Sequence, residues 1–343
     1  MRAPWANVLL MAILITLLIT GYLGLVSGEE KAAWRLSLHG IAAYALIVLF
    51  IWKSAIILDA YRRKNKWTRQ RILFVLLLVM LLAIVAMGLL WTVNGPLYVA
   101  GFSLVSLHIY LAIPTMLLMA WHSWRHKFIF RVKGSLDRRL FLGAATTAVL
   151  GAAFWRTAQW GQDLLEWPGA KRRFTGSYQR GSFTGTFPVV SWIADDPQPI
   201  DNSAWRLAID GAVEKPLSIS YEALLALPSV TREVVLDCTG GWYTRQLWQG
   251  VPLHDLFAQA ELIDTTVSIT VESVTGYTRR FPLAESHSML LAHHVAGQPL
   301  THGHGAPLRL VIPHKRGLEW VKWITAIHAN TTSALWQPPL PLP

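Results

Sequence analysis

The stretch VVLDCTGGWYTRQLWQG, residues 234–250, contains the only cysteine of the 343-residue chain. An apolar run with two valines precedes Cys238, and a pair of glycines follows Thr239. We expect a strand that ends at Cys238, because β-branched residues favour strands and glycines permit a sharp turn or the close approach of a ligand. Binding residues are frequent on loops that a rigid scaffold positions, so this turn is a candidate small-molecule site.

A single cysteine cannot form an intramolecular disulfide, so the thiol of Cys238 needs another explanation. The simplest is packing, since most free cysteines act as small buried hydrophobic residues. Alternatively, the thiolate is a ligand for a soft metal, with the nearby Arg245 helping to keep the sulfur ionised. A nucleophilic role is a third interpretation, although no neighbouring His–Asn pair accompanies the cysteine. The residues alone leave these alternatives open.

Around this stretch, short β-rich runs alternate with turn signals from about residue 185 onward. The runs are WRLAID, REVVLDC, VSITVES and LRLVIP. We predict one helix at SYEALLAL, with Ser220 as its N-cap, and another at PLHDLFAQAEL. These patterns predict an α+β domain with mixed sheets over residues 185–343, after a polar linker over 161–184.

The N-terminal part has a different composition. The chain is 53% hydrophobic with 15% charged residues, a high apolar fraction for a soluble protein. The excess lies in uncharged or nearly uncharged runs, each close to the ~20 residues that cross a bilayer as a helix. We therefore predict an all-α transmembrane bundle of about five helices over residues 1–160. The runs are 8–26, 36–58, 72–93, 97–121 and the shorter 140–155.

The net charge of +11 is unevenly distributed along the chain. Residues 1–160 hold 17 Lys and Arg against 4 Asp and Glu, with the excess in the segments 61–71 and 122–139. Positive charge marks cytoplasmic loops, so membrane topology explains the basic balance and nucleic acid is not needed. We predict a multi-pass protein of the inner (plasma) membrane, with a cytoplasmic N-terminus and a periplasmic C-terminal domain.

The last predicted span begins with the pair Arg138–Arg139 before Leu-Phe-Leu and a segment rich in small residues. This pattern resembles a twin-arginine export signal retained as a helix. An ordinary positive flank of a membrane helix is the alternative interpretation. The export reading matters because that route carries folded, cofactor-loaded domains.

Several separate motifs together resemble the molybdenum-binding domain of the sulfite oxidase family over residues 180–330. They are VVLDCTGGWYTRQLWQGVPLHDLF, VTGYTRRFPLAE, MLLAHHVAGQPLTHGHGAPLRLVIP and GLEWVKWITAI. The resemblance implies a molybdenum ion held by the dithiolene of one molybdopterin, with Cys238 as the protein ligand. It also implies that His304 and Arg309 contact the pterin and its phosphate, and that Lys322 acts similarly.

The cationic residues have an independent reason to bind a cofactor, because a buried phosphate needs fixed positive donors. We therefore include Arg245 and Lys315 with His304, Arg309 and Lys322 as predicted cofactor-binding residues. In the resemblance, His293 takes the place of a tyrosine near the metal, and we predict a catalytic role for it.

Two further departures, besides His293, put sulfite as the substrate in doubt. A basic element expected upstream of the domain is absent, and the sequence ends at residue 343 without an immunoglobulin-like dimerisation domain.

Histidines form two groups. Six lie between residues 287 and 314, which raises zinc as a rival metal, but their spacings match no compact zinc signature. His39 and His108 lie about one turn into the second and fourth predicted spans, both from the outer side. Two such imidazoles would bind a haem iron axially, whereas interhelical hydrogen bonds are the alternative explanation. The four-span region loosely resembles bacterial b561-type cytochromes, which implies one haem b.

Together these features predict a membrane-anchored oxidoreductase that depends on Mo-molybdopterin. We expect two-electron chemistry on a small-molecule substrate, most simply oxygen-atom transfer, coupled to electron transfer through the haem. A quinone or a soluble electron carrier is the expected partner. The alternatives are a reductase of oxidised sulfur compounds fed by quinol, and a non-catalytic membrane electron-transfer subunit.

Overall fold

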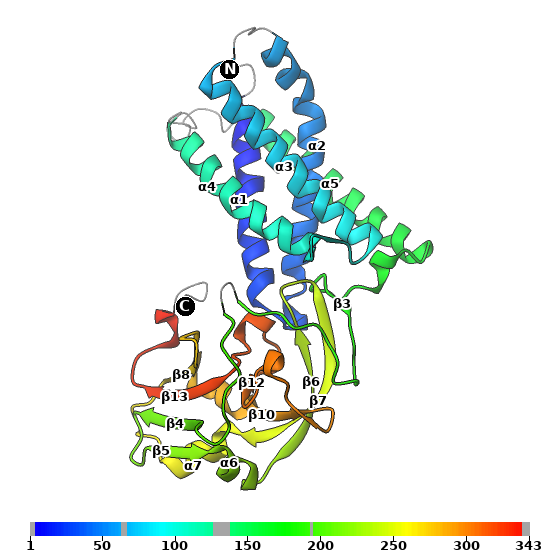
Figure 1. The fold of residues 1–343 in the computed structure, drawn as a ribbon. Coiled ribbons are helices and arrows are strands. Elements are labelled where there is room, and N and C mark those ends of the chain that lie inside the picture. Colours follow the sequence, from blue (N-terminus) through cyan, green and yellow to red (C-terminus); the bar gives the residue numbers. More distant parts are fainter. Residues whose placement is uncertain (1–3, 63–66, 126–137, 193–194, 338–343) are drawn as a thin grey trace. The chain divides into compact units, whose positions relative to one another are not determined.

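The computed structural model describes residues 4–62, 67–125, 138–192 and 195–337. Contacts divide the chain into two compact units (Figure 1). The helical unit comprises residues 1–25 and 29–178, and the β unit comprises residues 26–28 and 179–343. Parts of the two basic segments, 61–71 and 122–139, lie outside the described residues.

Five long helices build the helical unit. In this unit α2 packs against α5 and α3 packs against α4. Glycine permits the first of these contacts, because a Cβ at Gly151 on α5 would lie 2.8 Å from the carbonyl oxygen of Ile41 on α2. The helices are α1 (Pro4–Val26), α2 (Trp34–Arg62), α3 (Arg69–Asn94), α4 (Leu104–Arg125) and α5 (Arg138–Leu164).

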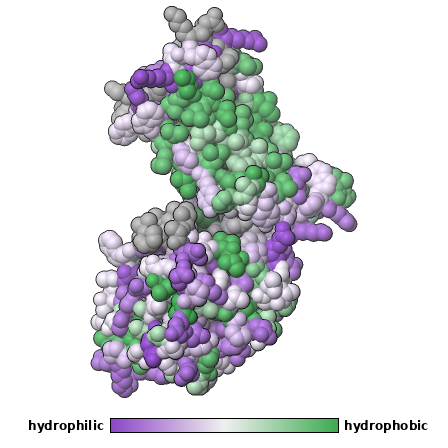
Figure 2. All heavy atoms as spheres, in the orientation of Figure 1, coloured by the Kyte–Doolittle hydropathy of each residue, from purple (hydrophilic) through white to green (hydrophobic). Residues whose placement is uncertain are grey.

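Within the described residues, five helices are long and apolar enough to cross a membrane. The visible surface of the helical unit is correspondingly rich in hydrophobic residues (Figure 2). One predicted span is shorter than expected, because residues 98–103 form a small hairpin of β1 (Tyr98–Val99) and β2 (Phe102–Ser103). Gly95 and Gly101 adopt φ of +86° and +84° around it, so the backbone turns before α4 begins.

The β unit contains two sheets. The six-stranded sheet has the order β11-β10-β7-β3, with β12 also paired to β10 and β6 to β7; the five-stranded sheet has the order β5-β4-β13-β8-β9. In the second sheet β13 is parallel to β4 and antiparallel to β8, so this sheet is mixed, as the sequence predicts.

The strands of the six-stranded sheet are β3 (Tyr178–Gln179), β6 (Val230–Asp237), β7 (Trp242–Pro252), β10 (Leu290–Val295), β11 (Gln298–Pro299) and β12 (Arg309–Val311). Those of the five-stranded sheet are β4 (Arg206–Gly211), β5 (Leu217–Ser220), β8 (Ser268–Ser273), β9 (Thr278–Pro282) and β13 (Ile324–Asn330).

The two predicted helices of the β unit are present as α6 (Tyr221–Ala226) and α7 (Leu253–Ala260). The Ser220 side chain accepts a hydrogen bond from the backbone N–H of Ala223, as expected of an N-cap. Short 3-10 helices connect other elements; they are η1 (Glu30–Ala32), η3 (Pro168–Lys171), η4 (Leu283–Ser288), η5 (His302–His304), η6 (Gly317–Glu319) and η7 (Ala334–Trp336).

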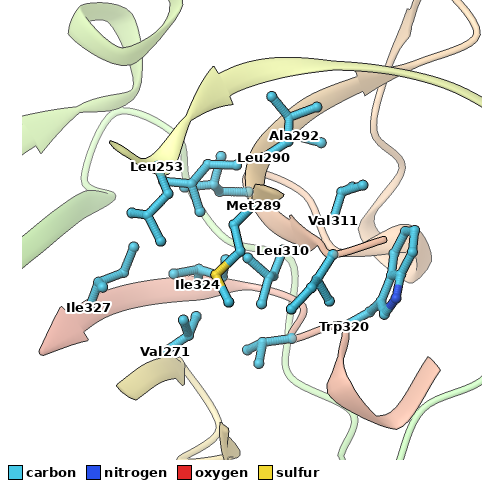
Figure 3. Packing of buried hydrophobic residues seen from close by; sticks show 14 of the residues in the cluster. Leu253, Val271, Met289, Leu290, Ala292, Leu310, Val311, Trp320, Ile324 and Ile327 are labelled. Atoms are coloured by element: carbon cyan, nitrogen blue, oxygen red, sulfur yellow. The ribbon is translucent and has the colours of Figure 1, made fainter. Parts of the chain in front are cut away.

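Side chains from both sheets share one hydrophobic core (Figure 3). Met289 and Leu290, at the start of β10, pack with Leu310 of β12 and Ile324 of β13, and all four are fully buried. The same core includes Cys238, which is 7% exposed. The cysteine is therefore held by a rigid two-sheet scaffold.

Candidate functional site

The turn after β6 fixes the position of Cys238. Strands β6 and β7 pair antiparallel up to Asp237 and Tyr243. Beyond that pair, the N–H of Cys238 donates to the carbonyl of Trp242 at 2.8 Å, and the N–H of Gly241 donates to the carbonyl of Cys238 at 3.2 Å. Gly241 has φ of +87°, a conformation that favours glycine. The second glycine therefore closes a tight turn that holds the thiol at the strand end.

Gly240 leaves open the space beside the thiol. Its N–H donates to Cys238 Sγ at 3.3 Å, and a Cβ built at Gly240 would lie 3.5 Å from that sulfur. Burial raises the pKa of the Cys238 thiol above its ordinary value, although the Gly240 N–H and Arg316 oppose the shift. A coordinated metal deprotonates a cysteine thiol outright, so burial does not prevent ligation.

Arg316 is the cation attached to this turn. Its Nη2 donates to the carbonyl of Cys238 at 3.0 Å, and its Nε lies 3.5 Å from Oδ1 of Asp237. Both side chains are buried, with exposed fractions of 4% and 2%. We predicted Arg245 and Lys315 as the cations here and missed Arg316, which directly follows Lys315 in the sequence.

Arg309 projects from β12 into the same core. Its guanidinium lies 5.0 Å from the ring centroid of Trp248 and 5.5 Å from that of Trp320. Nη1 donates to the carbonyl of His304 at 3.0 Å, but the buried Nε has no hydrogen-bond partner among the described residues. Burial lowers the pKa of Arg309 to about 9, and the nearby Cys238 opposes the shift. A buried guanidinium with an unpaired N–H is stabilised by an anionic partner.

Lys322 adds a second cation beside Arg309. Its Nζ donates to the carbonyl of Gly303 at 2.6 Å and to Ser191 Oγ at 3.4 Å. Burial and the neighbouring Arg309 lower the pKa of Lys322 to about 7, against the effect of Cys238. Neither cation forms an ion pair with a carboxylate in the parts of the chain that the structure describes. Asp195 and Cys238 both favour the charged form of Lys322, but neither forms a direct ion pair with it among the described residues.

His304 lies next to these cations, as predicted, but both ring nitrogens are engaged within the protein. Nε2 donates to the carbonyl of Phe187 at 3.0 Å, so Nδ1 accepts from the Thr301 hydroxyl at 3.0 Å. The imidazole stacks on the Phe187 ring at a centroid distance of 3.9 Å. Its evident role is to hold the loop whose carbonyls at 303 and 304 bind Lys322 and Arg309.

Two predicted cofactor ligands point elsewhere. Arg245 lies on β7 opposite Val235, with a half-exposed side chain that pairs with Glu233 at 3.2 Å. Lys315 pairs with Glu285 at 2.9 Å. Each of these two cations is thus paired with a carboxylate in the structure, and their role in cofactor binding stays a prediction.

A catalytic role for His293 stays a prediction; the structure places this histidine beside Ser229. Its Nε2 lies 3.1 Å from Ser229 Oγ, and Ser229 precedes β6 whereas Cys238 follows it. A strand of this length, at about 3.3 Å per residue, separates the two ends by roughly 25 Å. Burial, with a smaller effect of His294, lowers the pKa of His293 to about 4, so the imidazole is neutral there.

In the helical unit, the structure brings the two predicted haem ligands together. The ring centroids of His39 on α2 and His108 on α4 lie 6.2 Å apart. His39 Nδ1 donates to the carbonyl of Leu17 at 3.1 Å, and His108 Nδ1 donates to the carbonyl of Ile84 at 2.9 Å. No hydrogen bond from either Nε2 occurs within the described residues, so both of these nitrogens are available for a metal.

The similarity to a known protein family lies in the β unit. The family described as oxidoreductase molybdopterin binding domain matches residues 194–335. The uncharacterized oxidoreductase YuiH of Bacillus subtilis is 32% identical over 147 residues, which cover 42% of this chain and 74% of that protein. The chain belongs to this family of molybdopterin-binding oxidoreductases.

Other similar proteins have named activities. The protein-methionine-sulfoxide reductase catalytic subunit MsrP of Gluconobacter oxydans is 30% identical over 36% of this chain and 46% of its own length. Human mitochondrial sulfite oxidase is 29% identical over 40% of this chain and 32% of its own length. Outside YuiH, the chain thus spans less than half of these relatives. The sulfane dehydrogenase SoxCD of Paracoccus pantotrophus aligns with a TM-score of 0.38 and 28% identity, over 39% of this chain and 40% of that chain.

The site residues fit the cofactor of the molybdopterin oxidoreductases. Cys238 offers a sulfur that would serve as a soft thiolate ligand. Arg309, whose Nε has no hydrogen-bond partner among the described residues, and Lys322 are cations to which a phosphate would bind. Among the described residues, no three His, Cys, Asp or Glu side chains converge as a metal site, so the zinc alternative has no support from geometry.

Proposed function

We propose that this chain is a membrane-anchored molybdoenzyme that binds one molybdopterin in its β unit, with Cys238 as the protein ligand to molybdenum. The observation that carries the proposal is a buried thiol, Cys238, near two cations, Arg309 and Lys322, of which the buried Arg309 keeps an Nε without a hydrogen-bond partner among the described residues. In this assignment Arg309 and Lys322 hold the phosphate, and His304 holds the loop between them. Arg316 braces the Cys238 turn through its carbonyl.

When bound, such a cofactor supplies two-electron chemistry, and we assign oxygen-atom transfer to it here. The protein contributes a fixed position for the thiolate and a pocket from which most water is excluded. Asp237, Cys238 and Trp242 are each at most 7% exposed, so local charges act there with little screening.

Two directions of the reaction fit this site. Oxidation of a small substrate is one direction. The reverse direction, reduction of an oxidised sulfur compound with electrons from quinol, is supported by the similarity to MsrP, whose name records methionine sulfoxide reduction. A non-catalytic electron-transfer subunit is disfavoured, because such a protein has no need of the Cys238 turn together with a buried Arg309 that keeps an unpaired Nε.

We further propose that the helical unit binds one haem b between His39 and His108, as in b561-type cytochromes. His39 and His108, whose ring centroids lie 6.2 Å apart, would hold the iron through their Nε2 atoms, and the haem would supply one-electron transfer. Both Nδ1 atoms donate to carbonyls, the arrangement that fixes a ligating histidine with Nε2 toward the metal.

Glycines support the haem assignment. A Cβ at Gly21 on α1 would lie 3.2 Å from Cε1 of His39, and one at Gly88 on α3 would lie 3.4 Å from Cε1 of His108. Each glycine lies one helical turn after the residue, Leu17 or Ile84, whose carbonyl accepts a hydrogen bond from the histidine. A planar ring beside each histidine needs this lack of side chains on the facing helix.

The five apolar helices support membrane association. We propose an inner-membrane location with a cytoplasmic N-terminus, a periplasmic β unit, and a quinone or soluble carrier as the electron-exchange partner. One experiment tests the cofactor proposals together: molybdenum analysis and an optical spectrum of the purified full chain. We expect one molybdenum and one b-type haem per chain. Absence of molybdenum from protein made in molybdopterin-producing cells contradicts the catalytic proposal, whereas absence of haem contradicts only the electron-transfer part.

A further inference from the structure

The indole nitrogen of Trp242 is a buried donor without an acceptor in the described part of the chain. Trp242 begins β7, four residues after Cys238, and is 5% exposed. Other buried tryptophans of the β unit are satisfied by the protein itself: Nε1 of Trp205 donates to Ile324 O at 3.0 Å and Nε1 of Trp248 donates to Val234 O at 3.1 Å. Buried indole N–H groups normally have a partner, so Trp242 is an exception that needs an explanation.

The position of this nitrogen relates it to the thiol. A Cβ built at Gly240 would lie 3.5 Å from Cys238 Sγ and 3.7 Å from Trp242 Nε1. The two atoms therefore lie on the same side of the glycine, each within van der Waals distance of the position that a Cβ would take. No hydrogen bond joins the indole to the sulfur, since Nε1 has no partner of any kind among the described residues.

The other side of the indole leads to the cofactor-binding residues. The Phe187 ring lies 6.1 Å from that of Trp242 and stacks on His304, whose carbonyl accepts from Arg309. Trp242, Phe187 and His304 thus form a row of rings between the thiol and the cations. The unpaired Nε1 of Trp242 lies at the thiol end of this row.

We propose that Trp242 Nε1–H donates a hydrogen bond to an oxygen atom held beside Cys238 in the molybdenum pocket. The oxygen belongs either to the bound cofactor or to an oxygen-bearing substrate, and the proposal rests on the function proposed above. A neutral indole suits this role, because it is a donor only and does not titrate. It would position the oxygen and stabilise negative charge that develops on it, without adding a cation next to the thiolate.

The test compares Trp242→Phe with Trp205→Phe in the full chain, with and without cofactor. Cofactor-free protein comes from cells that cannot make molybdopterin. Without cofactor, Trp242→Phe should lower the midpoint of thermal unfolding of the β unit only through lost packing, because the lost N–H had no partner. Trp205→Phe should lower that midpoint further, because it also leaves the carbonyl of Ile324 unpaired.

Two further measurements identify the source of the oxygen. If it belongs to the cofactor, the cofactor-induced rise in the unfolding midpoint is smaller in Trp242→Phe than in the wild type, and it is unchanged in Trp205→Phe. If it belongs to the substrate, that rise is normal but the loaded Trp242→Phe protein binds methionine sulfoxide or inorganic sulfate at least about fivefold more weakly, the loss of one hydrogen bond.

The inference is overturned if Trp242→Phe matches the wild type in both measurements. That outcome is distinct from failure of the proposed function, which would appear as wild-type protein that takes up no molybdenum. If the wild-type protein takes up no molybdenum, both proposals are abandoned.

Discussion

At the residue scale, the position of Cys238 was predictable because three local features agree. A β-branched run, a thiol and two glycines occur in one short stretch. The positive φ of Gly241 explains why a glycine is needed in the turn after the thiol. Arg309 and Lys322 follow from the resemblance and from the need of a buried phosphate for cations, and the structure places them close together. Arg316 was not predictable, because only the extended backbone at residues 315–316 decides which of two adjacent cations faces inward. The place of His293 beside Ser229 was not predictable for a related reason: it depends on strand pairing that no local motif reveals.

The role of Cys238 leads to the first prediction. Cys238→Ser replaces a soft thiolate with a hard, weakly acidic hydroxyl at nearly constant volume. We expect turnover per molybdenum atom to fall by orders of magnitude, because the ligand shapes the transition state. Folding and any haem spectrum should be nearly unchanged, and Arg309 and Lys322 should retain part of the cofactor. Dye-linked turnover normalised to molybdenum measures the effect, with Thr239→Ser as the matched control. Near-wild-type turnover per atom would show that Cys238 is only a packing residue.

At the element scale, most strands and helices follow from the alternation of apolar runs and turn signals. The hairpin β1–β2 does not, because the residues around it are apolar and continue the hydropathy of α4. Only the conformations of Gly95 and Gly101 mark it. Composition therefore predicts that a segment is apolar, but local backbone geometry decides where its helix begins.

The turn between β6 and β7 gives the second prediction. Gly241→Ala places a Cβ on a residue with φ of +87°, and we expect it to destabilise the β unit by roughly 1–2 kcal/mol. Gly240→Ala is the control, since its Cβ would make only ordinary contacts at 3.5–3.8 Å. Urea unfolding of the cofactor-free protein measures both free energies. Equal effects of the two substitutions would contradict the assignment of the strained position to Gly241.

The five-stranded sheet gives the third prediction, which concerns pH. His328 on β13 contacts Asp210 of β4 through Nδ1 at 2.5 Å and Glu272 of β8 through Nε2 at 3.0 Å. Burial lowers the pKa of His328, but the hydrogen bonds and charges of the two carboxylates outweigh it and raise the pKa above the model-compound value of 6.5. The folded state therefore binds the proton more tightly than the unfolded state.

The stabilisation by His328 should be fully present below pH 6.5 and should disappear as the pH rises through the raised pKa. We expect the unfolding midpoint of the β unit to fall across that interval in the wild type. His328→Gln should remove this component of the pH dependence, whereas His287→Gln, an exposed histidine of the same unit, should leave it unchanged. Urea titrations at a series of pH values measure it. An identical pH profile for His328→Gln and the wild type would refute the cluster's role.

At the scale of the whole molecule, the chain joins a helical unit and a β unit of different physical character. If the β unit takes up its cofactor before export, the pair Arg138–Arg139 at the start of α5 should direct that export. We expect replacement of both residues with lysine, which keeps the charge, to retain the β unit in the cytoplasm. Protease accessibility in spheroplasts measures its location, and Arg156→Lys near the other end of α5 is the control. A cofactor-loaded β unit that still reaches the periplasm would rule out the signal.

The helical unit contains a repeated arrangement that the sequence does not reveal. No internal repeat is visible by composition, yet α1–α2 and α3–α4 each combine a backbone carbonyl, a glycine one turn later, and a histidine on the following helix. The two arrangements bring His39 and His108 to one place. Such a pair can be recognised only after the helices are packed, because the backbone carbonyls of Leu17 and Ile84, which accept from the two histidines, have no sequence signature.

This arrangement gives the last prediction. His39→Ala and His108→Ala should each abolish the reduced-minus-oxidised b-type signal, because a six-coordinate haem needs both axial imidazoles. His122→Ala should keep most of the signal, since His122 lies 14 residues beyond His108 on α4, about 21 Å along the helix axis. Gly21→Leu and Gly88→Leu test the same site without touching a ligand, and each should reduce haem content by filling the space beside a histidine. Optical spectra and haem extraction on purified full-length protein provide the measurements. Loss of the signal in His122→Ala with its retention in His39→Ala would show that the pairing of His39 with His108 is wrong.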